Sequence, residues 1–438
     1  MESRHGFNFA RLHFDAGGTL QDPASLDEVK AADGDVILIA HGFRNDENDA
    51  TSLYDRFLST FRDHLTSGAF PIAAARTHTF AGIYWPSKPF QESFGDGTVQ
   101  AVDAETAGKE AVRAQIEDLK AALDVPEQRA KLDEAIALLE GIGDSAGAQD
   151  QFVSKVLSIL EGAPDDPTEG GDRIRATEGS VLLDKLKVPI IVPSGNSDSE
   201  GGTLSLDAPA GDGEGGTQGI GSFFGSIFGR IGQFLNLTTW YLMKNRSGAV
   251  GAAGVAQAVR DLTAARPGIR VHLVGHSLGG RLMAGCAKSL AETHHRVESL
   301  TLLEAAFSHY GFSPNNGKGV AGFFREVVES GVVAGPLIAT FSAQDTVVGR
   351  VYAVASRLAG DSVQEIGDAN DAYGGIGRNG AQKTPEAESG PLHAVGNPYQ
   401  FHPAKVECLD GSGGLIRDHG DVTNATVTYA FASVIEAT

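Results

Sequence analysis

Cysteine is scarce in this chain of 438 residues, which contains only Cys286 and Cys408. Two cysteines so far apart provide neither a disulfide framework nor the close spacing of a metal-binding motif. The sequence also lacks a glycine-rich phosphate loop followed by Lys-Ser or Lys-Thr, and no dinucleotide-binding fingerprint follows its first predicted strand. These absences predict a protein that works without a metal ion or a cofactor.

Long apolar segments are absent as well. The N-terminal stretch MESRHGFNFARLHF has no apolar core of signal-peptide length. No run approaches the roughly 18 apolar residues that a membrane span needs. We therefore expect a cytoplasmic protein without stable membrane insertion, although secretion without a signal peptide stays open.

Positive charge is in short supply, because 35 lysines and arginines face 56 aspartates and glutamates and leave a net charge of -21. Such an acidic surface repels phosphate backbones and anionic lipid, so nucleic acid is not an expected partner. The 41% of hydrophobic residues suffices for a large core. Composition leaves the oligomeric state open.

Short apolar runs that suit buried strands alternate with segments of helical period. Strands are predicted from Asp35 onward and at 79–85, 270–274, 297–303, 336–341 and 405–409. Helices are predicted at 49–65, 236–265, 277–293, 347–358 and 422–435. Repeated β-α units of this kind predict an α/β protein with a doubly wound, mainly parallel sheet.

The alternation is interrupted after Pro86. Helical patterns at 105–123, 126–139 and 149–160 are followed by a stretch rich in Gly, Ser and Asp at 194–221, which reads as a flexible loop. We interpret this part as a helical cap inserted into the α/β domain. The chain then divides into residues 1–85, the insertion 86–232, and residues 233–438.

A phenylalanine-rich segment, Gly219–Leu235, has its apolar residues at helical spacing. One interpretation is a lid or lipid-contacting helix over an acyl pocket. The other is an amphipathic helix packed on the core, which is the commoner role of such a stripe.

The pattern Gly-x-Ser-x-Gly occurs twice, around Ser145 and around Ser277, and means little alone in a chain with 56 glycines. A nucleophilic serine needs a strand, a tight turn and then a helix, so that its hydroxyl is exposed at the end of the sheet. The segment RVHLVGHSLGGRLMAGCAKSL provides this order around Ser277. Ser145 lies between two helical patterns and is interpreted as a helix cap.

The segment LVGHSLGG after a strand resembles the nucleophile elbow of α/β-hydrolases, especially lipase-like and esterase-like members. AHGF, a later WPS and MKNRSGAVG also resemble a group of microbial serine hydrolases with poorly assigned substrates. The resemblance runs from about Val36 to the C-terminus, without the insertion. It implies the α/β-hydrolase fold and hydrolysis of a carboxylic ester.

A serine hydroxyl needs a base, and in this fold the acid and the histidine follow the serine in that order. His419 is the predicted base because it lies between the last predicted strand and the closing helix, whereas His393 and His402 precede that strand. Asp345, directly after a late strand, is the predicted acid. Its alternative role is a helix cap, and Glu304 is the alternative acid.

Two amide donors are needed for the oxyanion that forms during acyl transfer. The amide after the nucleophile belongs to Leu278. In resembling enzymes the residue after His-Gly provides the second amide, and this position is Phe43. His41 is a candidate for orienting this loop, and Arg44 for contacting a substrate acid.

We therefore predict a serine esterase acting on a small-molecule or lipid ester through an acyl-enzyme. Peptidase, thioesterase and acyltransferase activities use the same residues and stay open. Two further hypotheses are a non-catalytic binding protein of the same fold and a lipid-surface lipase with the phenylalanine-rich helix as its lid.

Overall fold

The computed structural model describes residues 1–87, 104–143, 145–162, 166–187, 226–359, 369 and 372–438. Its centre is one nine-stranded sheet in the order β1-β2-β4-β3-β5-β6-β7-β9-β8. Only β1 is antiparallel to its neighbour, and every other pair in the sheet is parallel. The strands are β1 (Glu2–Arg4), β2 (Phe7–His13), β3 (Asp35–Ala40), β4 (His78–Tyr84), β5 (Val271–His276), β6 (Ser299–Leu303), β7 (Leu337–Phe341), β8 (Ala387–Pro391) and β9 (Val406–Asp410).

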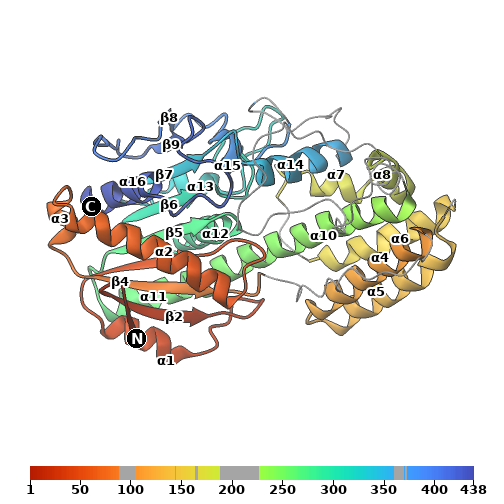
Figure 1. The fold of residues 1–438 in the computed structure, drawn as a ribbon, viewed down its shortest axis with the longest axis horizontal. Helices are drawn as coiled ribbons and strands as arrows, with labels where there is room; N and C mark the ends of the chain where they lie inside the picture. Colours follow the sequence, from red (N-terminus) through yellow and green to blue (C-terminus); the bar gives the residue numbers. More distant parts are fainter. Residues whose placement is uncertain (88–103, 144, 163–165, 188–225, 360–368, 370–371) are drawn as a thin grey trace.

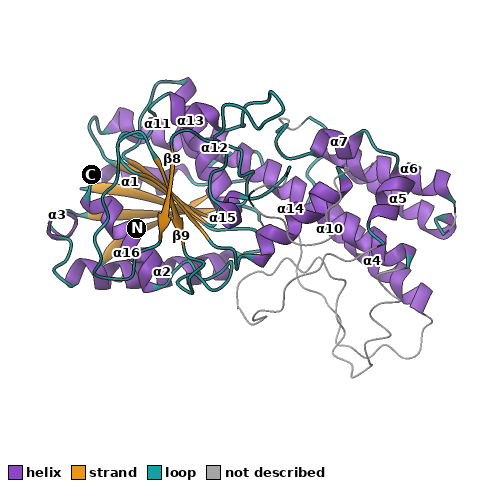
Figure 2. Cartoon of the chain, turned by 90° about the horizontal axis from the view of Figure 1, so that it is seen from above, coloured by secondary structure: helices purple, strands orange, loops and turns teal. Residues whose placement is uncertain are grey.

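Helices cover both faces of this sheet (Figure 2). One face carries α1 (Pro23–Ala31), α11 (Ala256–Ala265), α12 (Leu278–Glu292) and α13 (Arg325–Glu329), and the other carries α2 (Glu47–Thr66), α3 (Pro71–Ala74) and α16 (Ala425–Glu436). In β3, Leu38 packs into the first layer and its neighbours Ile37 and Ile39 into the second. A strand buried on both faces must be apolar throughout, which explains the run DVILIA. The predicted α/β class with a mainly parallel, doubly wound sheet is confirmed.

The insertion forms a group of helices beyond the sheet, toward the right in Figure 1. It contains α4 (Ala104–Ala121), α5 (Pro126–Leu138), α6 (Ala146–Leu157), α7 (Gly171–Arg175) and α8 (Gly179–Lys185). The three helices predicted here correspond to α4, α5 and α6. The Gly-rich segment 194–221 lies outside the described residues.

Helix α10 (Ile227–Ala249) joins the two parts, because it packs against α4 and α8 at one end and against α12 at the other. It continues through a π-helical segment, Val250–Val255, into α11. The predicted boundary at residue 232 therefore falls inside one continuous helix. The two helices predicted at 219–235 and 236–265 form one continuous helical segment from Ile227 onward. Phe223 and Phe224 lie outside the described residues.

The apolar side chains at the start of α10 are buried. Phe228 is 4%, Ile231 0% and Phe234 1% exposed. This part of the helix is thus packed on its neighbours, which agrees with the interpretation of the phenylalanine-rich segment as an amphipathic helix packed on the core. Among the described residues, no helix has the length and apolarity needed to cross a bilayer.

Two helices near the carboxyl ends of the strands complete the frame of the site. They are α14 (Thr346–Leu358), which follows β7, and α15 (Ile376–Asn379), whose backbone packs against Glu304 at the end of β6. The ends of β3, β5, β6, β7 and β9 therefore meet at one edge, where ligands bind in open parallel sheets.

Candidate active site

Ser277 lies in the turn between β5 and α12, with φ of 58° and ψ of -124°. A residue with a side chain rarely adopts a positive φ, and such strain persists only where the surroundings impose it. Here the Ser277 amide donates to the Leu303 carbonyl at 3.0 Å, and the Ala306 amide donates to the Ser277 carbonyl at 2.9 Å. A Cβ on Gly279 would lie 2.4 Å from the Ala40 carbonyl oxygen, so this turn requires glycine. The strand–turn–helix context predicted for Ser277 is confirmed.

The second Gly-x-Ser-x-Gly match has a different role. Ser145 is the N-cap of α6, and its hydroxyl accepts a hydrogen bond from the Ala148 amide at 3.3 Å. The predicted helix cap is confirmed, and a serine in this setting has no strand to present it at a sheet edge.

Three predicted side chains meet at the carboxyl edge of the sheet. The Ser277 hydroxyl lies 2.8 Å from Nε2 of His419, and Nδ1 of His419 lies 2.8 Å from Oδ2 of Asp345. Because a carboxylate only accepts, Nδ1 carries the proton and Nε2 is left to accept from the hydroxyl. Ser277 is 6% and His419 7% exposed, and Asp345 is fully buried. A base oriented in this way can take the proton from an attacking serine.

Asp345 makes both of the contacts that its position suggested. Its Oδ1 accepts from the Val348 amide at 2.9 Å and caps α14, while Oδ2 accepts from His419. The cap holds the carboxylate in one rotamer, which fixes the imidazole in turn. Glu304, the alternative acid, lies farther away, with Oε2 at 3.7 Å from His419 Nδ1.

A second histidine holds the backbone of the base. His276, directly before the nucleophile, donates from Nε2 to the His419 carbonyl at 2.8 Å, and the two rings lie 4.8 Å apart. The other histidines considered from the sequence have different contacts. His393 stacks on Tyr399, and His402 pairs with Glu388 and Glu407.

The loop after β3 lies directly against the serine. A Cβ on Gly42 would be 2.8 Å from Ser277 Cβ and 3.3 Å from its hydroxyl oxygen. Phe43 follows in this loop, and Leu278 is the first residue of α12, where backbone amides have no intrahelical acceptor. Leu278 thus begins α12 at the positive end of the helix dipole, and Phe43 directly follows the glycine that lies against Ser277.

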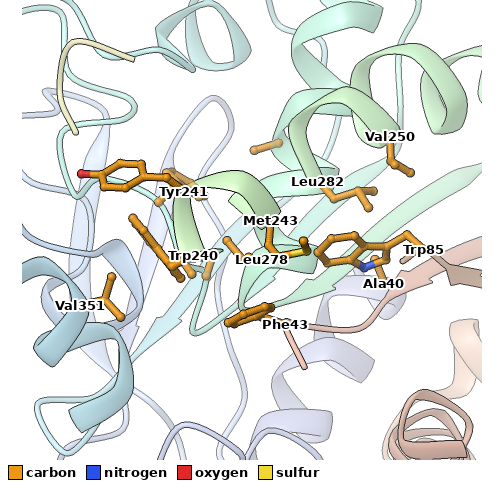
Figure 3. Close-up of a cluster of buried hydrophobic side chains, with 14 of the residues drawn as sticks. Ala40, Phe43, Trp85, Trp240, Tyr241, Met243, Val250, Leu278, Leu282 and Val351 are labelled. Carbon is orange, nitrogen blue, oxygen red and sulfur yellow. The ribbon is translucent and has the colours of Figure 1, made fainter. Parts of the chain in front are cut away.

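The side chains of the same two residues serve the core. Phe43 is 7% exposed and Leu278 is fully buried, and both lie close to Met243 of α10 (Figure 3). The Arg44 guanidinium lies over the Phe43 ring, 5.6 Å from its centroid.

A latch of three residues, Trp85, Pro86 and Ser87, holds the loop after β3. The Trp85 indole donates to the His41 carbonyl at 3.0 Å, and its ring stacks on the His41 imidazole. The Ser87 carbonyl accepts from the Arg44 amide at 3.1 Å, and its hydroxyl donates to the Asn45 carbonyl at 2.8 Å. The WPS segment thus fixes the loop that contains Gly42 and Phe43.

We expect Trp85→Phe to lower kcat about tenfold with little change in KM. The ring stacking on His41 is kept, but the buried His41 carbonyl loses its donor, which costs about 1–3 kcal/mol and loosens the loop. Steady-state kinetics and urea unfolding measure both effects. Trp240→Phe on α10 removes the same volume from a buried indole that is 2% exposed. Equal losses of kcat in the two variants would mean that the latch has no specific role.

Two buried histidines make the stability of this region depend on pH. Burial lowers the pKa of His41 to about 4 and the pKa of His276 to about 3, from an ordinary 6.5. Both stay neutral in the folded protein while the unfolded chain takes up protons below pH 6.5. These histidines therefore do not reduce the free energy of unfolding above that pH. The free energy of unfolding falls as the pH decreases toward the pKa values of the folded protein.

Lowering the pH from 7 to 5 should accordingly remove about 2 kcal/mol of unfolding free energy for each of these histidines. Urea unfolding at several pH values measures the change. His276→Asn should be less stable than wild type at pH 7 but lose less on acidification. A pH dependence identical to that of the wild type would contradict a neutral, buried His276.

Two groups of side chains in the described residues bring three possible metal ligands within 4.8 Å of one another. The first is Glu304, Asp345 and His419, in which the imidazole proton already binds Asp345. The second is Glu388, His402 and Glu407, in which Lys405 pairs with Glu388 at 2.9 Å. At least one possible ligand of each group is already engaged by another side chain, and neither group is assigned as a metal site.

Sequence reasoning missed the supporting contacts. His276 stands next to the serine in GHSLGG, and WPS was noted as a motif, but neither pattern indicates a partner. Each contact joins segments more than 40 residues apart, and local periodicity does not report such distances. The general requirement that a functional loop be held rigidly is the one signal that could have indicated a support of this kind.

Comparison of the chain with protein-family models, with curated proteins and with solved structures finds no match.

Proposed function

We propose that this protein is a serine hydrolase of the α/β-hydrolase fold that cleaves carboxylic esters. One observation carries the proposal, the chain of two 2.8 Å contacts from the Ser277 hydroxyl through His419 to Asp345. The strained turn at Ser277, at the carboxyl edge of a parallel sheet, supports it further. The ester as substrate rests on the resemblance of LVGHSLGG to esterase and lipase elbows.

In this mechanism the Ser277 oxygen attacks the ester carbonyl carbon while its proton passes to His419 Nε2. The amides of Phe43 and Leu278 bind the negative oxygen of the tetrahedral intermediate, each contributing roughly 3 kcal/mol. The intermediate collapses, the alcohol leaves with the proton from His419, and an acyl-Ser277 remains. Water then attacks the acyl group, gives a proton to His419, and releases the acid as Ser277 recovers its proton.

A panel of p-nitrophenyl esters, matched thioesters and matched anilides tests the substrate class. We expect short-chain esters to have the highest kcat/KM of the three series. Higher values for thioesters or anilides would replace the esterase by a thioesterase or an amidase with the same residues. Failure of all three, in a chain that is folded by circular dichroism, would favour a binding protein instead.

Micellar substrates test the lipase hypothesis on the same preparation. The buried side chains at the start of α10 do not by themselves favour a mobile lid. We therefore expect no rise in activity when a long-chain ester passes its solubility limit. A sharp rise at that limit would support a helix that opens at a lipid surface.

A further inference from the structure

Glu304 is a buried carboxyl beside the base, and the mechanism above leaves it unused. It directly follows β6, has a positive φ of 42°, and is fully buried. Its amide donates to the Thr340 hydroxyl at 3.2 Å, which fixes the backbone. Oε2 lies 3.7 Å from His419 Nδ1, the nitrogen that Asp345 already binds.

The carboxyl of Glu304 has no hydrogen-bond partner for either oxygen among the described residues. The ionisable groups that face it are the base and three acids, namely His419, Asp345, Asp418 and Asp421. Burial and then repulsion by Asp345 raise its pKa well above the ordinary value. Both effects favour the protonated form of the Glu304 carboxyl.

Stability alone does not account for an acid at this position. A buried polar group without a partner costs about 1–3 kcal/mol, and an apolar side chain of similar size avoids that cost. Buried, unsatisfied ionisable groups beside reacting atoms are candidates for function. The nearest reacting group is the imidazole of His419.

We propose that Glu304 is a second positioning acid for His419, which accepts the Nδ1 proton when Asp345 cannot. This role rests on the proposed hydrolase function. A side-chain movement of about 1 Å would bring Oε2 into hydrogen-bond distance of Nδ1. For this role Glu304 must lose one proton to solvent. Its carboxylate can then accept a hydrogen bond from Nδ1 of the imidazole.

Removal of the charge on Asp345 is the condition under which this role becomes visible. In Asp345→Asn, the acid that most strongly opposes ionisation of Glu304 loses its charge. Asn also keeps an oxygen for the Val348 amide, so that the cap of α14 is preserved. Glu304 then ionises at a lower pH than in the wild type and orients His419 from its own side.

The rate of fluorophosphonate labelling of Ser277, measured from neutral to alkaline pH, tests the proposal. We expect Asp345→Asn to label about 10²-fold more slowly than wild type at neutral pH and to recover as the pH rises. The double variant Asp345→Asn/Glu304→Gln should label about 10⁴-fold more slowly, as when a triad loses its acid altogether, without recovery. The single variant Glu304→Gln is the folding control. Its thermal unfolding shows whether the substitution at position 304 disturbs the fold.

Equal labelling of the single Asn variant and the double variant at every pH would overturn the second acid and leave the hydrolase proposal intact. A wild type that does not label at all would instead remove the hydrolase proposal. In that case the downfield proton resonance of His419 Nδ1 still tests Glu304. The resonance should persist in Asp345→Asn at alkaline pH and vanish in the double variant, and its absence from both would also overturn the inference.

Discussion

Replacement of Ser277 by alanine is expected to lower kcat for ester hydrolysis by about 10⁵-fold or more. The methyl group has no oxygen to attack the carbonyl, while the fold around it is unchanged, because the turn is held by the backbone contacts of Ser277 to Leu303 and Ala306. Steady-state kinetics on a short-chain ester measures the loss. A cooperative unfolding transition shows that the variant is folded.

The size of the loss should not grow when a second member of the group is removed. His419→Ala alone is expected to lose about as much as Ser277→Ala, and the double variant no more than either, because the residues act as a unit. Ser145→Ala is the matched control, since it removes a serine from the same pattern but costs only about 1 kcal/mol of helix capping. Comparable activity of Ser277→Ala and Ser145→Ala would show that Ser277 is not the nucleophile.

The second large effect is expected at a position without a side chain. Gly42→Ala places a Cβ 2.8 Å from Ser277 Cβ and 3.3 Å from both Ser277 Oγ and His276 Nδ1. The loop must then move away from the serine and take the amide of Phe43 with it. Since loss of one oxyanion donor reduces kcat by about 10²–10³-fold, we expect a decrease of that order.

Gly413→Ala provides the matched glycine control for this experiment, because no atom lies within 4 Å of its added Cβ. It should retain wild-type kinetics. The melting temperature of each variant separates loss of fold from loss of chemistry. If Gly42→Ala had the kcat of Gly413→Ala, the loop after β3 would not contribute to the oxyanion site.

The central strands could be predicted because their patterns are strong. β3 and β5 are buried on both faces, so their sequences are short apolar runs that only a parallel sheet accommodates. The edge strand β8 could not be predicted in this way. It contains Glu388, Gly390 and Pro391 and, within the described part of the chain, pairs only with β9, so its extended shape comes from the backbone ladder and not from side-chain preference.

Helix α10 illustrates how packing overrides a local signal. Gly229 and Gly232 weaken a helix by about 1 kcal/mol each relative to alanine, and a helix boundary was predicted nearby. The helix continues through both glycines, because Ile231, Phe234 and Trp240 are buried and α10 packs against α4, α8 and α12. Tertiary burial of this size outweighs the propensity of two glycines.

The residues of the site were accessible from the sequence because each follows a predicted strand at the same sheet edge. Ser277 follows β5, Asp345 follows β7 and His419 follows β9, so the topology brings them together. The cap at Asp345 was also predicted, but only as an alternative to its contact with His419, and the structure shows both contacts at once. The contact of His276 with His419 depends on atomic distances that no sequence pattern encodes.

The most direct test of the account is the site of covalent modification. The wild-type protein is treated with a fluorophosphonate probe, digested, and mapped by mass spectrometry. We predict one probe adduct, on the peptide that contains Ser277, and no adduct in Ser277→Ala. An adduct on another residue, or an unlabelled protein that still hydrolyses esters, would contradict the assignment of Ser277 as the nucleophile.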